Sequence, residues 1–149
     1  FPPAVKLKLK VETNCREHFA ELGWKKKSFS VNTGWFSGSC KLTTYTIEEL
    51  LGTKLRALYQ RRKGRDLYDL HKALTYSKLN KKDIIDCFKR YMKFSVGEVP
   101  SQKEFLNNMD RKIKHPEFLA DILTLLRPDE KYNQEAAYEL VKNELIERI

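Results

Sequence analysis

From residue 47 to the C-terminus the sequence is a succession of amphipathic segments, and this pattern constrains the fold most. Leucine and isoleucine recur at helical spacing over residues 47–62, and comparable patterns follow in the later segments. The residues that precede these segments are typical of helix starts: Thr46 with Glu49, Asn80, Ser101 with Glu104, and Pro116. We therefore predict about five helices after residue 46.

The chain before residue 47 has the pattern of β-strands instead. Residues 5–13 alternate strictly between apolar and polar side chains, and residues 28–33 and 41–46 are rich in strand-forming residues. Strands followed by helices predict an α+β fold, with three phenylalanines in its core: Phe19, Phe29 and Phe36. A sheet of only three short strands would be more stable as one edge of a larger sheet. We therefore expect further strands upstream of Phe1, where the chain also lacks an initiator Met.

The composition excludes several classes of protein. A hydrophobic fraction of 41% is too high for a disordered chain, and no apolar run is long enough to span a membrane. The three cysteines and three histidines do not form ligand pairs at zinc spacing, and the motifs of P-loop proteins and common hydrolases are absent. We expect a cytoplasmic protein without a membrane partner, because an odd number of separated cysteines suits a reducing compartment.

An excess of basic residues points to polyanion binding. The chain has 29 Lys and Arg against 20 Asp and Glu, a formal net charge of +9. Residues 53–65 are the densest stretch, with six basic residues and no acidic one, and residues 25–27 form a second cluster. Such a surface attracts the phosphates of nucleotides or nucleic acids, although a solvated basic face is the simpler interpretation.

One basic segment ends in two carboxylates. At helical spacing Lys54, Arg61 and Arg65 fall within about 40° of one another, and Asp66 and Asp69 are three residues apart. Phosphoryl chemistry uses such groups, because Lys and Arg hold phosphates while Asp binds a metal or positions a hydroxyl. In the alternative interpretation Asp66 is an N-cap, and Arg65 and Asp69 form ordinary ion pairs.

The stretch KLRALYQRRKGRDLYDL (54–70) resembles the signature of the AbiEii/AbiGii-type nucleotidyltransferase toxins of abortive-infection toxin–antitoxin systems. Residues 6–19 and 23–58 are also similar to that family, so the resemblance extends from about residue 5 to 76. It implies part of a polymerase-β-like nucleotidyltransferase sheet in residues 1–76. A helical C-terminal bundle would then occupy residues 77–149.

The resemblance also implies roles for single residues. Lys54 and Asp66 would be catalytic, and Lys54, Arg61 and Arg65 would bind the nucleotide triphosphate. Asp69 would be a supporting residue. Glu12 would be a metal ligand, the third acidic residue of a site for two Mg²⁺ ions.

The remaining metal-binding motifs of the family, a Gly-Ser turn and an Asp-x-Asp strand, belong upstream of Phe1. We therefore expect this chain to be inactive alone. Its full-length parent would transfer a nucleotide from an NTP to an RNA acceptor, and we expect this acceptor to be tRNA. Two alternatives are a nucleic-acid-binding module without chemistry and a module whose C-terminal helices dock a cognate antitoxin. Trp24 and Trp35 are candidates for stacking on a base, although packing in the core or at its rim is the commoner use of aromatic rings.

Overall fold

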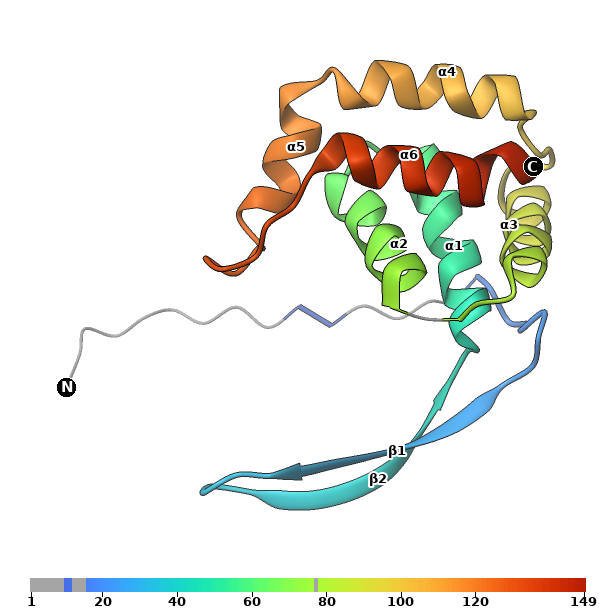
Figure 1. Ribbon diagram of the computed structural model, residues 1–149. Helices are drawn as coiled ribbons and strands as arrows, with labels where there is room; N and C mark the ends of the chain where they lie inside the picture. The colour runs from blue at the N-terminus through green and yellow to red at the C-terminus, as the bar shows by residue number, and fades with distance from the viewer. Residues whose placement is uncertain (1–9, 12–15, 77) are drawn as a thin grey trace.

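The computed structural model describes residues 10–11, 16–76 and 78–149. In this part of the chain an antiparallel hairpin is followed by six α-helices and a short 3-10 helix, which confirms the α+β class (Figure 1). The elements are β1 (Lys25–Asn32), β2 (Ser37–Thr44), α1 (Ile47–Gln60), α2 (Gly64–Tyr76), α3 (Lys81–Val96), α4 (Gln102–Ile113), α5 (Pro116–Leu123), α6 (Gln134–Glu144) and η1 (Ile146–Arg148). Most of the predicted strand 5–13 lies outside the described residues.

The predicted helix starts are confirmed by hydrogen bonds at the caps. The Asn80 side chain accepts the backbone N–H groups of Lys82 and Asp83 at the start of α3. Ser101 and Glu104 form a reciprocal capping box before α4, and Pro116 is the first residue of α5. These local contacts satisfy backbone donors that have no partner within the helix.

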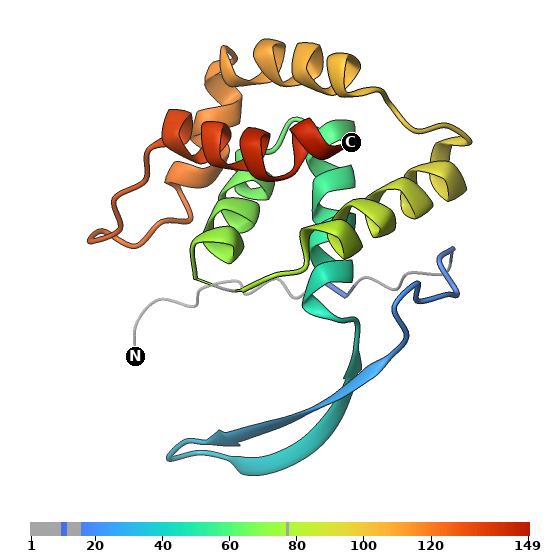
Figure 2. The ribbon, with the colours of Figure 1, turned by 45° about the vertical axis from the view of Figure 1, so that its right-hand side comes forward.

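The helices form one body in which α1 and α2 stand side by side. α3 packs against α1, while α5 and α6 pack against α2 (Figures 1 and 2). The buried apolar side chains come from all six helices and include Leu55, Leu58, Leu67, Leu70, Phe88, Met92, Phe105, Met109, Phe118 and Val141. The core is thus shared between residues 1–76 and 77–149, and the boundary between two domains at residue 76 stays a prediction.

Two glycines allow helices to approach closely. A Cβ atom on Gly52 in α1 would lie 2.6 Å from the Cβ atom of Cys87 in α3. A Cβ atom on Gly64, the first residue of α2, would lie 1.9 Å from the carbonyl oxygen of Phe118 in α5. The first residue of α2 is therefore also a point of close contact between α2 and α5.

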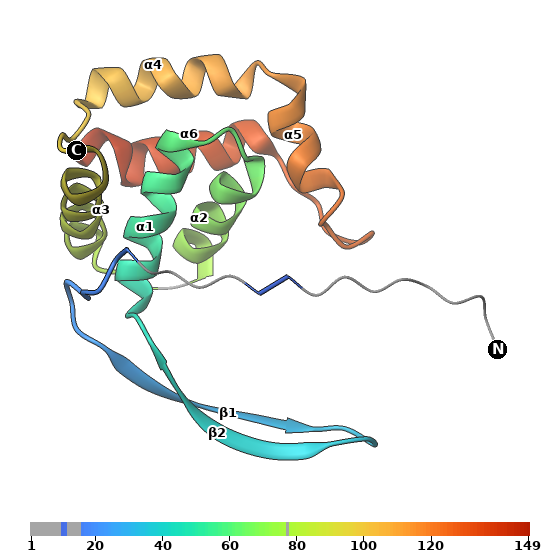
Figure 3. The same cartoon turned by 180° about the vertical axis from the view of Figure 1, so that it is seen from behind.

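The hairpin projects from the helical body, and none of the described helices or strands forms a second layer over either of its faces (Figures 1 and 3). Its register runs from the pair Lys25–Thr44 to the pair Asn32–Ser37, so both strands are longer than predicted. Phe29 is 52% exposed and Phe36 is 65% exposed. The prediction that these two rings are core residues is therefore wrong for the described chain, because a two-stranded sheet cannot bury a face on itself.

Candidate functional site: a cation–carboxylate cluster between α1 and α2

Four of the predicted site residues lie in contact near the end of α1 and the start of α2. The carboxylate of Asp66, in the first turn of α2, is completely buried. Arg61 donates to it through two nitrogens, with Nε 2.6 Å from Oδ2 and Nη2 2.7 Å from Oδ1. Lys54 Nζ lies 3.3 Å from Asp66 Oδ1 and 2.8 Å from Asp69 Oδ2. We call these four residues the Lys54–Asp66 cluster.

The cluster assembles differently from the single helical row that the sequence predicts. α1 ends at Gln60, and Arg61 has an extended backbone with φ −125° and ψ 160°. This bend turns the Arg61 side chain back toward α2, where it forms a bidentate pair with Asp66. The alternative in which Asp66 is an N-cap does not hold, because α2 begins two residues earlier and the carboxylate accepts from Arg61 instead.

The charges of the cluster balance, but its cations lie at the surface. The hydrogen bond with Asp66 raises the pKa of Arg61, and the nearby carboxylates of Asp121 and Asp69 add to this effect. The side chains of Lys54 and Arg61 are 30% and 49% exposed, whereas Asp66 is inaccessible. Phosphate oxygens match the geometry in which guanidinium groups bind carboxylates. The arrangement is therefore able to present two oriented cations to a phosphate.

Arg65 does not join the cluster. Its backbone N–H donates to Asp121 Oδ2 in α5 at 3.3 Å, and its Nη1 atom lies 3.7 Å from Asp121 Oδ1. Lys63 Nζ lies 3.2 Å from the same oxygen. Burial alone would raise the pKa of Asp121, but the hydrogen bonds from Arg65 and Lys63 and their charges lower it overall. Arg65 thus helps to fix α2 against α5.

Lys112 of α4 is a buried cation that was not predicted from the sequence. Its Nζ atom donates to the carbonyl oxygens of Leu58 and Tyr59, at 2.5 and 2.6 Å, and so caps the end of α1 just before Arg61. Its pKa is lowered to about 8, mainly by burial and also by the charges of Arg111 and Arg62, while Asp66 acts in the opposite direction. The signal was present in the sequence, because Lys112 follows Phe105 and Met109 at helical spacing on the buried face of α4.

Glu49 was expected to complete a capping box, and its structural role is different. Thr46 Oγ1 accepts the Glu49 backbone N–H at 3.2 Å, which confirms Thr46 as the N-cap of α1. The buried Glu49 carboxylate accepts the N–H groups of Glu21 and Leu22 at 2.7 and 3.1 Å, and the Tyr91 hydroxyl of α3 at 2.7 Å. It therefore ties the segment before the hairpin to the helical body.

The described residues do not by themselves fit a magnesium site. No three His, Cys, Asp or Glu side chains cluster within residues 10–11, 16–76 and 78–149. The carboxylates of Asp66 and Asp69 are already paired with cations. Glu12, the predicted metal ligand, lies outside the described residues, so both Glu12 and the Mg²⁺ ions stay predictions.

The two tryptophans lie at opposite ends of the hairpin. Trp24 stacks on Tyr45, with ring centroids 4.7 Å apart, and closes the base of the hairpin. Trp35 lies in the turn and is 99% exposed. In the part of the chain described here, no helix is both long and apolar enough to cross a membrane.

The Lys54–Asp66 cluster thus places two partly exposed cations around a buried carboxylate in an α+β fold. The family model described as "Nucleotidyl transferase AbiEii toxin, Type IV TA system" matches residues 2–140 of the 149. The chain therefore belongs to the AbiEii family of nucleotidyltransferase toxins from type IV toxin–antitoxin systems, as its sequence resemblance implies. Searches of the curated proteins and of the solved structures found no match.

Proposed function

We propose that this chain belongs to a toxin that transfers a nucleotide from an NTP to an RNA acceptor, and that its Lys54–Asp66 cluster binds the triphosphate of the NTP. The observation that carries the proposal is the Lys54–Asp66 cluster, which lies within the stretch 54–70 that resembles the family signature. The family assignment over residues 2–140 supports the reaction class. An RNA acceptor, a nucleotide triphosphate and a cognate antitoxin are parts of the proposal.

Lys54 and Arg61 bind the triphosphate in this proposal. Their side chains are partly exposed, and phosphoryl transfer requires cations that neutralise charge on the triphosphate. Asp66 is a positioning residue, since its carboxylate is buried and contacts both cations. Asp69, which pairs with Lys54 at 2.8 Å, supports it from the next turn of α2. We assign no nucleotide contact to Arg65, because it is paired with Asp121.

The metal chemistry of such an enzyme requires ligands beyond the described residues. We propose that Glu12 contributes one carboxylate and that upstream residues contribute the others. Bound Mg²⁺ would supply charge stabilisation during nucleotidyl transfer.

The test is a transfer assay on the full-length toxin with labelled NTPs, Mg²⁺ and tRNA. Lys54→Ala is expected to lower the rate about 100-fold or more and to raise the KM for the NTP, because a transition-state phosphate contact is lost. Lys103→Ala, at an exposed lysine of α4, is the matched control and is expected to retain the parent rate. Parent-like transfer by Lys54→Ala would contradict the proposal.

A positioning role for Asp66 predicts a second result in the same assay. Asp66→Asn keeps the shape of the side chain but removes the charge that holds Lys54 and Arg61. We expect the KM for the NTP to rise and its binding to weaken, while far-UV circular dichroism stays unchanged. Asp86→Asn, at an exposed carboxylate of α3, is the control. An Asp66→Asn protein with the parent KM for the NTP would show that the Lys54–Asp66 cluster does not bind the NTP.

A further inference from the structure

The β1–β2 hairpin presents two chemically different faces, neither of which the proposed function uses. Side chains alternate between the faces of a strand, and partners opposite each other lie on the same face. From the register, Phe29 and Val31 of β1 share one face with Cys40 and Leu42 of β2, and Lys25 and Lys27 lie on the same face nearer the base of the hairpin. We call the first four of these residues the apolar hairpin face. The other face carries only small polar residues and lysines: Lys26, Ser28, Ser30, Asn32, Ser37, Ser39, Lys41 and Thr43.

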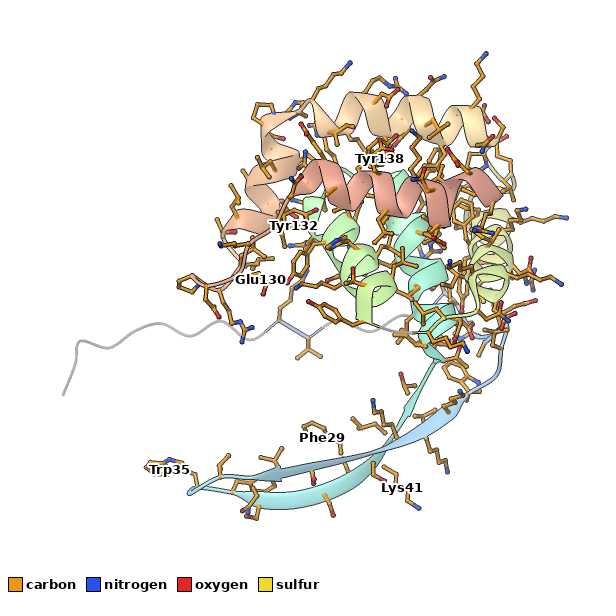
Figure 4. The ribbon with its side chains drawn as sticks, viewed as in Figure 1. Phe29, Trp35, Lys41, Glu130, Tyr132 and Tyr138 are labelled. Atoms are coloured by element: carbon orange, nitrogen blue, oxygen red, sulfur yellow. The ribbon has the colours of Figure 1, made fainter. Side chains whose placement is uncertain are left out.

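The apolar hairpin face is open to solvent. Phe29 and Leu42 are 52% and 50% exposed, and they line a depression of about 270 Å³ together with Lys27. Phe29 points to the inner side of the curved hairpin and Lys41 points to the outer side (Figure 4). The turn adds two more exposed rings, Trp35 at 99% and Phe36 at 65%. Three aromatic rings are therefore available along one ribbon.

The hairpin also carries basic residues and no acidic ones. No acidic residue occurs from residue 22 to 47, whereas Lys25, Lys26, Lys27 and Lys41 all lie there. The first three line a second depression, of about 390 Å³, at the base of the hairpin. An apolar protein partner would bring no counter-charge to these lysines. A polyanion with flat apolar rings complements both the charge and the exposed aromatic side chains.

We propose that the hairpin binds a single-stranded segment of RNA, with bases stacked on Trp35, Phe36 and Phe29 and with phosphates held by the lysines at residues 25–27. Aromatic rings interleaved with cations bind single strands in this way with little sequence preference. The inference rests on the proposed function, since it assigns the acceptor to a surface of the same chain.

The position of the hairpin suits an acceptor-binding element. β2 ends at Thr44 and α1 begins at Ile47, so the base of the hairpin leads directly into the helix that carries Lys54. At 1.5 Å per residue, Lys54 is about 10 Å along α1 from its first residue. An RNA strand bound along the hairpin is thereby led toward the Lys54–Asp66 cluster.

The experiment measures binding of a fluorescein-labelled single-stranded RNA of about 12 nucleotides to the protein by anisotropy, without NTP or metal. The double variant Phe29→Ala/Trp35→Ala is expected to weaken binding about tenfold or more at unchanged salt dependence. Lys25→Ser/Lys27→Ser is expected to lower the slope of log K against log salt by about 1.4, since each single-strand phosphate contact contributes about 0.7. Both changes are at exposed positions, and circular dichroism checks that the helices are intact.

The controls remove an exposed aromatic ring or two exposed lysines at positions away from the hairpin. Tyr76→Ala removes a ring that is 75% exposed at the end of α2. Lys82→Ser/Lys103→Ser removes two exposed lysines, from α3 and α4. Both controls are expected to bind the RNA as the parent does, and equal losses in controls and hairpin variants would overturn the proposal.

Measurements on the same variants distinguish RNA binding by the hairpin from a protein interface, and test it separately from the proposed function. If the parent self-associates, and Phe29→Ala/Trp35→Ala gives a monomer with unchanged RNA affinity, the apolar hairpin face is a protein interface and the proposal is wrong. If Lys54→Ala abolishes transfer while hairpin variants bind RNA normally, only the proposed function stands. If the hairpin variants lose RNA although no transfer occurs, the hairpin inference stands without the proposed function.

Discussion

Asp66 is the side chain on which the geometry of the candidate site depends. Its carboxylate accepts hydrogen bonds from Nε and Nη2 of Arg61 and forms an ion pair with Lys54, although it is completely buried. Removal of one partner of a buried ion pair lowers the free energy of unfolding by more than the intact pair contributes. The reason is that the remaining charge is left without a counter-charge.

We expect Asp66→Ala to lower the free energy of unfolding by about 2–3 kcal/mol, less than for a fully buried pair because Arg61 is half-exposed. Asp69→Ala, at a carboxylate that is 46% exposed with Lys54 as its partner, is expected to cost less than about 1 kcal/mol. Urea unfolding of the two variants measures both values. Equal losses would show that burial of Asp66 does not matter to stability.

Lys112 predicts a pH dependence of stability. Its pKa is about 8 in the folded protein against an ordinary 10.5, so the unfolded chain binds the proton more tightly between these values. Stability is therefore expected to rise as the pH increases from about 8 to 10.5, by up to about 3 kcal/mol from this group.

The measurement compares urea unfolding of the parent and of Lys112→Met across this pH range. The methionine keeps the apolar stem but has no proton to lose. The difference in unfolding free energy between the two proteins is expected to grow with pH in favour of the parent. This comparison removes the contribution of other groups, such as Tyr91, whose pKa is raised mainly by burial. A constant difference would contradict the prediction.

At the scale of elements, Gly52 sets the distance between α1 and α3. Alanine is preferred over glycine in a helix by about 1 kcal/mol. A Cβ atom at this position would nevertheless lie 2.6 Å from Cys87 Cβ and 2.9 Å from the carbonyl oxygen of Ile84. Backbone on one side and a short side chain on the other leave no flexible group to move aside.

We expect Gly52→Ala to lower the free energy of unfolding by about 2 kcal/mol despite the better helix propensity. Gly34→Ala, in the hairpin turn, introduces a Cβ atom with no neighbour within 4 Å and is expected to be nearly neutral. Thermal unfolding distinguishes the two variants. Stabilisation by Gly52→Ala would mean that α1 and α3 are less tightly packed than the structure shows.

Local sequence signals predicted the starts of the helices well. Thr46, Asn80, Ser101 and Pro116 each satisfy or avoid a free backbone donor within a few residues, so their effect does not depend on the rest of the fold. The path of Arg61 was not predictable in this way. Its extended backbone depends on where α2 docks against α5, which is a contact between distant segments.

At the scale of the whole molecule, the helical body and the hairpin are separate in their packing. In the described part of the chain the buried apolar residues begin at Leu51, and none comes from β1 or β2. The hairpin strands contact mainly each other. The stability of the helices is therefore expected to be independent of the hairpin.

Replacement of residues 25–44 by a short Gly-Ser linker tests this independence. We expect the helical circular dichroism signal to persist and the Tm to change by no more than about 5 °C, equivalent to about 1 kcal/mol or slightly more. Loss of cooperative unfolding would contradict the separation. The same deletion is expected to remove RNA binding if the hairpin is the acceptor surface.

The class of fold and the helix starts follow from local pattern, because capping and periodicity act over a few neighbouring residues. The residues around Asp66 were indicated by the family resemblance, whereas the single helical row that periodicity predicted for them did not form. The tertiary structure decided which of those residues meet. It joined Arg61 to Asp66, directed Arg65 to Asp121 and buried Lys112 against the end of α1. It also left Phe29 and Phe36 exposed, since burial of a strand face requires a second layer that lies far away in sequence or in another molecule.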